Sequence, residues 1–145
     1  MGKGKLRYGL DYPNQCPPKE AHTVNHDIWL YRICVCEQLE QSGALNLENF
    51  IPVWEQDRFF PPKKECSAKA ISFNSSSQAC WSLIDDYPNI GKKVIKVAIN
   101  QACGLILQSN KSTHYNLWDY SNPDISLAIG NKWKEVVRDD SKAGV

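Results

Sequence analysis

The sequence lacks an excess of positive or negative charge, and it lacks segments that direct a protein to a membrane or a compartment. The formal net charge is only +1 over 145 residues, whereas domains that bind nucleic acid mainly through electrostatics carry a marked basic excess. No uninterrupted apolar run approaches the roughly 18 residues that a membrane-spanning helix needs. Residues 1–18 include basic side chains but no apolar stretch of signal-peptide length. We therefore expect a cytoplasmic protein that makes no contact with membranes.

Catalytic and cofactor motifs are also missing. The stretch GKGK at residues 2–5 lacks the Gly-Lys-Ser/Thr ending of a P-loop, and no Gly-x-Ser-x-Gly elbow is present. The chain has no internal repeat and no low-complexity segment. The sequence thus predicts no cofactor, and it favours a binding protein over an enzyme.

The overall composition is that of an ordinary globular domain. Hydrophobic residues make up 42% of the chain and charged residues 23%, which excludes a disordered protein. Proline pairs at residues 17–18 and 61–62 divide the sequence. We predict an extended N-terminal arm over residues 1–18 and one compact, mainly α domain over residues 19–145. The alternative is an α+β fold with a small antiparallel sheet.

Residues 75–107 give the clearest local pattern. Apolar residues from Ala79 to Tyr87 repeat at helical spacing after serines that can cap a helix, and Pro88 ends this segment. From Gly91 to Ile106 a second apolar stripe predicts another helix. The unit therefore resembles two helices joined by a turn.

The polar side of the second predicted helix carries a basic stripe. Its members are Lys92, Lys93, Lys96 and Asn100. A helix, a turn and a basic helix describe a helix-turn-helix reader of nucleic acid, which we keep as an alternative. The acidic pair at residues 85–86 lies directly upstream and would repel phosphates, so local charge compensation is the default interpretation.

Three other segments are assigned from spacing and capping residues. Residues 20–41 repeat apolar side chains at steps of three and four, which predicts a helix, although the β-branched and aromatic run at residues 28–36 also suits a strand. Asn46 can cap a short helix that Pro52 ends. Asn122 followed by proline predicts a helix reaching Val137, with a β-hairpin around residues 130–131 as the alternative.

Six cysteines are present, and without a leader sequence we expect them to be reduced. A zinc site is a weak possibility at His22, His26, Cys34 and Cys36. Two histidines one helical turn apart could share an ion, but two cysteines two residues apart on a helix point in different directions.

A thiol enzyme is a further hypothesis. Cys80 or Cys103 would be the nucleophile and His114 the base, with Asp119 or Asn116 orienting the imidazole. The sequence contains no local signature for such a site, so this stays a minor alternative.

Aromatic side chains supply the remaining candidates for binding. The segment at residues 114–122 reads HYNLWDYSN, and Tyr115, Trp118 and Tyr120 fall outside the predicted helical stripes. Exposed rings are common at protein interfaces, although these rings could also fold back over the core. Together these observations favour a non-enzymatic interaction protein, such as an adaptor, an inhibitor or a small subunit. Nucleic-acid binding and a small zinc or thiol enzyme are the alternatives.

Overall fold

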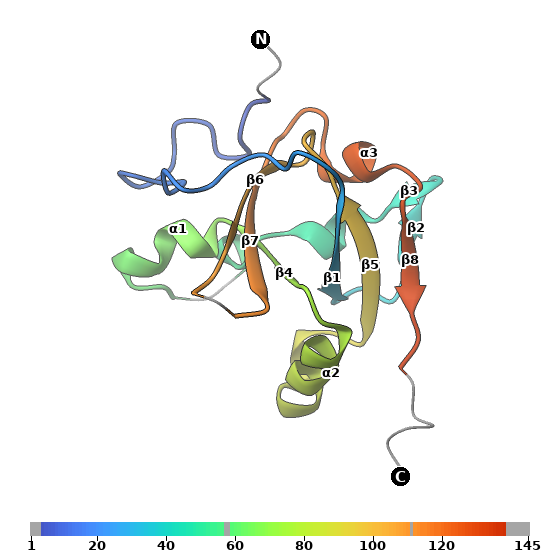
Figure 1. The fold of residues 1–145 in the computed structure, drawn as a ribbon. Coiled ribbons are helices and arrows are strands. Elements are labelled where there is room, and N and C mark those ends of the chain that lie inside the picture. The colour runs from blue at the N-terminus through green and yellow to red at the C-terminus, as the bar shows by residue number, and fades with distance from the viewer. Residues whose placement is uncertain (1–3, 57–58, 111, 139–145) are drawn as a thin grey trace.

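A computed structural model of the protein describes residues 4–56, 59–110 and 112–138. Its main feature is a six-stranded antiparallel sheet with the strand order β6-β7-β4-β1-β5-β8 (Figure 1). The strands are β1 (Ile28–Cys34), β4 (Ile71–Asn74), β5 (Lys93–Ile99), β6 (Gly104–Gln108), β7 (His114–Asp119) and β8 (Trp133–Val136). A separate two-stranded ribbon pairs β2 (Glu40–Gln41) with β3 (Ala44–Leu45).

Helices are short and lie around this sheet. They are α1 (Glu65–Ala68), α2 (Ser77–Asp86) and α3 (Ile125–Ile129), with 3-10 turns η1 (Leu47–Phe50), η2 (Val53–Glu55), η3 (Pro62–Lys64) and η4 (Pro88–Ile90). The mainly α, all-helical prediction is therefore wrong. The alternative with an antiparallel sheet comes closer, but the sheet is the dominant element rather than a small addition.

The helix predictions fail where apolar residues form interior strands of the sheet. Residues 20–41 contain β1, which pairs with β4 on one side and β5 on the other. Residues 91–106 form β5, a turn and the start of β6, so the second helix of the expected helix-turn-helix unit does not exist. Buried central strands read as continuous apolar runs and can imitate a helical stripe.

Two predictions that rested on capping residues are confirmed. The Ser76 side chain accepts a hydrogen bond from the Ala79 amide at the start of α2, and the helix ends at Asp86, two residues before Pro88. Asn46 caps η1 in the same way. The helix predicted from Asn122 to Val137 is only partly right, because α3 is capped by Asp124 and ends before Gly130, after which the chain forms β8.

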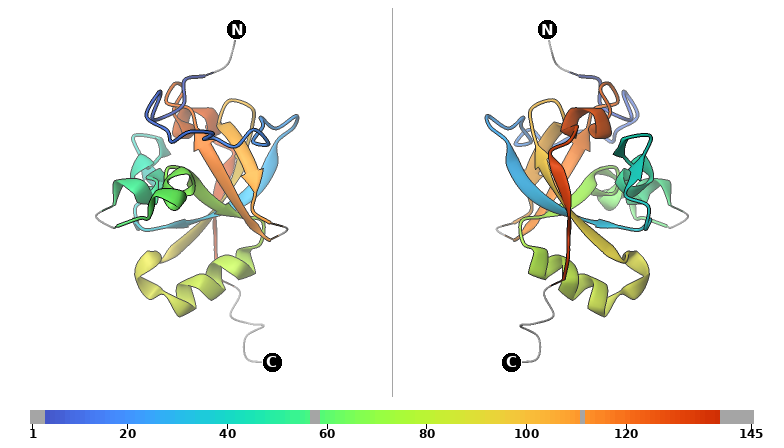
Figure 2. Two further views of the ribbon diagram at one scale, coloured as in Figure 1. Left: turned by 90° about the vertical axis from the view of Figure 1, so that its left-hand side faces the viewer. Right: turned by 90° about the vertical axis from the view of Figure 1, so that its right-hand side faces the viewer.

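The core lies on one side of the sheet, which we call the inner face. Cross-strand register places Leu30, Phe73, Ile95, Val97 and Leu117 on this face, and all are buried. Segments outside the sheet cover it with further apolar side chains, namely Val24, Leu39, Leu45, Phe50, Ile125 and Ile129. Helix α2 lies beneath the lower end of the sheet (Figures 1 and 2). The opposite side, the outer face, carries the alternate residues of each strand.

The N-terminal segment is tied to this body at several points. Leu6 forms an isolated bridge with Tyr120, and the Arg7 amide donates to the carbonyl of Asp119. A disulfide joins Cys16 to Cys66, so the expectation of reduced cysteines is wrong for this pair. Cys34, Cys36, Cys80 and Cys103 are free. Within the described residues no helix is long and apolar enough to cross a bilayer.

Candidate functional site

A row of polar and aromatic side chains crosses the outer face. Tyr31 of β1 is paired with Asn74 of β4 and with Lys96 of β5, and the row continues to His114 of β7 and Lys134 of β8. Directly paired residues point to the same face of a sheet. These five side chains therefore form one line across five strands, which we call the transverse row.

Trp29 lies beside the transverse row on the same strand as Tyr31. Trp29 and Tyr31 project from the same face of the sheet, because residues two apart on a strand share a face. The ring is 46% exposed, and the Lys96 ammonium lies 5.3 Å from its centre in a cation–π contact. The residue paired with Trp29 is Ala98, whose small side chain leaves the ring open to solvent.

The charged residues that the described strands place on the outer face are both lysines. Lys96 and Lys134 are directly opposite each other, and no Asp or Glu lies among the strand residues on this face. None of the ion pairs among the described residues includes either lysine. Like charges directly opposite on a sheet destabilise it. The arrangement would therefore be relieved by an anionic ligand.

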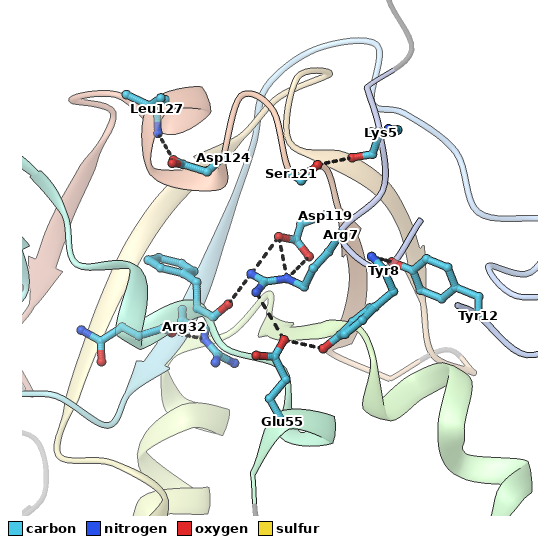
Figure 3. A network of polar contacts seen from close by, with 12 residues as sticks. Lys5, Arg7, Tyr8, Tyr12, Arg32, Glu55, Asp119, Ser121, Asp124 and Leu127 are labelled. Carbon is cyan, nitrogen blue, oxygen red and sulfur yellow. Dashed lines mark hydrogen bonds and ion pairs between the residues drawn. The ribbon is translucent and has the colours of Figure 1, made fainter. Parts of the chain in front are cut away.

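A second polar cluster holds the N-terminal segment against the sheet (Figure 3). Arg7 donates to both carboxylate oxygens of Asp119, with its Nε 3.0 Å from Oδ1 and its Nη2 2.9 Å from Oδ2, and it also bonds the carbonyl of Phe50. Glu55 accepts from the Tyr8 hydroxyl at 2.6 Å and lies 3.5 Å from Arg7. Burial raises the pKa of Asp119, and the guanidinium of Arg7 opposes that rise.

The cluster continues to a lysine enclosed by rings. Lys69 is 1% exposed, and its ammonium lies 4.7 Å from the ring centre of Trp54 and 5.2 Å from that of Tyr8. It donates to Glu65 Oε2 at 2.8 Å and to the carbonyl of Asp11. No buried side-chain nitrogen or oxygen of the described residues lacks a hydrogen-bond partner. This cluster is internally satisfied and serves to dock residues 4–12.

The basic stripe expected from the sequence is divided by the sheet. Lys93 and Lys96 point to opposite faces, because they are three residues apart on β5. Lys93 donates to the carbonyl of Glu37, and Lys92 forms an ion pair with the same glutamate at 3.7 Å. Asn100 bonds the carbonyl of Ala128 and the amide of Ala102 in the turn after β5. Only Lys96 of the four belongs to the transverse row.

The aromatic candidates at residues 114–122 are mostly covered. Trp118 is 2% exposed, and its indole donates to the carbonyl of Cys66. Tyr120 is 5% exposed and its ring contacts Gly4, while Tyr115 is half-buried against the core. These rings thus support the fold, and little of their surface is left for a partner.

The weak zinc candidates are not brought together. His22 and His26 are exposed in the segment before β1, Cys34 is buried at the end of that strand, and the Cys36 thiol lies 3.7 Å from Glu48. Across the described parts of the chain, no group of three His, Cys, Asp or Glu side chains is arranged for a metal ion.

The thiol-enzyme candidates have other partners. The His114 ring nitrogen Nδ1 lies 2.7 Å from the Ser109 hydroxyl, and Cys103 interacts with Asn100. Burial raises the pKa of both Cys80 and Cys103 to about 11. Thiols with such pKa values are protonated near neutral pH and are poor nucleophiles.

Comparisons with known proteins add no function to this geometry. No protein-family model matches the chain, and neither curated proteins nor solved structures gave a match. The candidate residues of the transverse row and its neighbourhood that sequence reasoning missed include Trp29, Tyr31 and Lys134. Their signal was the alternation within the strand alternatives at residues 28–36 and 130–137, which becomes visible only when those segments are read as strands.

Proposed function

We propose that the protein is a non-catalytic binding protein whose contact surface is the outer face of the sheet. The single observation that supports this most is the transverse row, which sets two lysines beside the half-exposed Trp29, and neither lysine forms an ion pair within the described residues. An exposed tryptophan offers a large rigid contact area at low entropic cost. A role as adaptor, inhibitor or small subunit belongs to this class of function.

The chemistry of the buried groups supports binding over catalysis. The pKa values of Cys34, Cys80 and Cys103 are raised by burial to about 12, 11 and 11. The Arg7–Asp119 pair and the Lys69 cluster are used to hold the chain together. The three thiols are buried, and the buried polar atoms of the two clusters have hydrogen-bond partners within the described part of the protein.

The test is variant-dependent capture from an extract of the native host. Three immobilised proteins are compared, namely the wild type, Trp29→Ala with Lys96→Ala, and a matched control. The control, Leu127→Ala with Lys63→Ala, also removes one exposed apolar side chain and one exposed lysine, but from α3 and η3. Circular dichroism establishes that all three are folded.

We expect a macromolecule that the wild type and the control retain and that the outer-face variant releases. Equal retention by all three proteins, or retention by none, contradicts the assignment of this face.

A further inference from the structure

We infer that the ligand of the outer face is single-stranded nucleic acid, an inference that rests on the proposed function of this face. The outer face brings together the two kinds of side chain that bind such a ligand, namely cations for phosphates and aromatic rings for bases. Lys96 and Lys134 can each meet a phosphate, and Trp29 and Tyr31 can each stack on a base.

Charge complementarity selects a polyanion. The strand residues of this face include no carboxylate, and Lys96 and Lys134 repel each other across β5 and β8. The acidic pair of residues 85–86, which argued against phosphate contact at the sequence level, is partly neutralised. Asp85 accepts a hydrogen bond from Arg138 at 2.8 Å, and this contact lowers its pKa. A phosphate chain would meet two cations, with no carboxylate among the strand residues of this face.

The spacing of the rings suits successive bases. Trp29 and Tyr31 are two residues apart on β1, which places their Cα atoms about 7 Å apart on one side of the strand. Lys96 is paired with Tyr31 and already lies over the ring of Trp29. When a base takes the face of Trp29, the ammonium of Lys96 moves from the ring to the adjoining phosphate.

The same features exclude a duplex as the preferred ligand. Base faces are hidden inside a double helix, so stacking on a ring requires unpaired nucleotides. The recognition helix predicted at residues 91–106 is absent, because residues 93–99 form the strand β5. Trp29 and Tyr31 lie on the sheet itself rather than on a projecting loop.

A protein partner fits this face less well. Lysine is depleted in the centre of protein interfaces, because burial of an unpaired ammonium is unfavourable. Here two lysines lie directly opposite each other on β5 and the edge strand β8, and one of them contacts the exposed Trp29. A nucleic acid supplies a phosphate for each of them and keeps those contacts partly hydrated.

The experiment is fluorescence anisotropy with labelled oligonucleotides of about 16 residues, long enough for one binding site. Single-stranded DNA, single-stranded RNA and a DNA duplex are titrated with the full chain to about 100 µM protein, the weak end of non-specific affinities. The variants are Trp29→Ala and Lys96→Gln with Lys134→Gln. The matched control for the lysines is Lys19→Gln with Lys63→Gln, which removes two exposed charges outside the row.

We expect both single strands to bind more tightly than the duplex. With two phosphate contacts, an increase from about 50 to about 200 mM salt weakens single-strand binding about sevenfold. The double lysine variant abolishes most of this salt dependence, and Trp29→Ala weakens binding about tenfold. The control variant binds like the wild type. Whichever of the two single strands binds more tightly identifies the preferred ligand as RNA or as DNA.

The absence of single-strand binding at about 50 mM salt overturns the inference, as does binding that is equal in the outer-face and control variants. Either result rejects the choice of ligand without deciding whether the outer face is a contact surface. If the capture experiment still depends on Trp29 and Lys96, the face binds a protein instead, and only the choice of ligand fails. If capture does not depend on them either, both proposals fail.

Discussion

Lys96 and Lys134 lie directly opposite each other on the outer face of β5 and β8, with no carboxylate among the strand residues around them. Like charges in this position cost stability, whereas opposite charges contribute to it. The repulsion between the two lysines therefore lowers the stability of the sheet, and the same two residues make this part of its surface basic.

Replacing one of these lysines by an acid tests that penalty. We expect Lys134→Glu to raise the free energy of unfolding by about 0.5 kcal/mol, because it converts a repulsive cross-strand pair into an attractive one. Urea denaturation at low salt measures the change. Lys63→Glu, at an exposed lysine of η3, is the control and should leave the midpoint unchanged. A Lys134→Glu protein less stable than the wild type would contradict the interpretation that Lys96 and Lys134 repel each other.

The ion pair of Arg7 and Asp119 anchors the N-terminal segment. The Asp119 side chain is 3% exposed, and Arg7→Ala leaves its carboxylate buried without a cation. We expect a loss of about 3 kcal/mol in unfolding free energy. Asp119→Asn added to Arg7→Ala should recover part of the loss, since no buried charge then remains. Strictly additive effects of the two single changes would show that the groups act independently.

The disulfide of Cys16 and Cys66 closes a loop between residues 50 apart in sequence. A cross-link of this length stabilises by about 4 kcal/mol in the loop-entropy model. We expect Cys16→Ser with Cys66→Ser to lose stability of this order in denaturant titrations. A reducing agent should lower the stability of the wild type to the same level while leaving the double variant unchanged. Equal sensitivity of both proteins to reductant would point to another bond.

The four free thiols should differ in reactivity. Burial raises the pKa of Cys34 to about 12 and that of Cys80 and Cys103 to about 11. The pKa of Cys36 is also raised, by burial and by Glu48, but its thiol is partly exposed to the reagent. Titration with a thiol reagent near pH 8 should therefore give one fast reaction in the native state and four after unfolding without reduction. Cys36→Ser should remove the fast phase. A fast phase that persists in this variant would mean that a buried thiol opens to solvent.

Stability should fall when the pH drops below about 6.5 because of His114. Burial lowers the pKa of this imidazole in the folded protein below its ordinary value of 6.5, so the unfolded chain binds the proton more readily. The stabilisation is fully present above pH 6.5 and is lost as the pH falls through the lowered pKa. The difference between wild type and His114→Asn, measured by denaturation between about pH 8 and pH 5.5, should shrink with decreasing pH. A constant difference over this range would rule out His114 as the titrating group.

The caps and proline breaks of two short segments could be predicted from the sequence. Ser76 and Pro88 bound α2, and Asn46 with Pro52 bounds η1, because capping and proline geometry depend on a few neighbouring residues. The charge of the outer face was only partly readable. Lys96 was a candidate from the start, but its partners Trp29 and Lys134 are distant in sequence and meet it only through strand register.

The sequence by itself determined the bounds of α2 and the capped start of η1, and it included Lys96 among the candidate contact residues. The tertiary structure decided that residues 28–34 and 93–99 are strands, because β1 and β5 pair with each other and are flanked by β4 and β8. The interior strand β5 buries apolar residues on both faces, so its sequence loses the alternation that would distinguish it from a helix. Pairing between distant segments supplied the missing information, and it also separated Lys93 from Lys96 and placed Trp29 beside the latter.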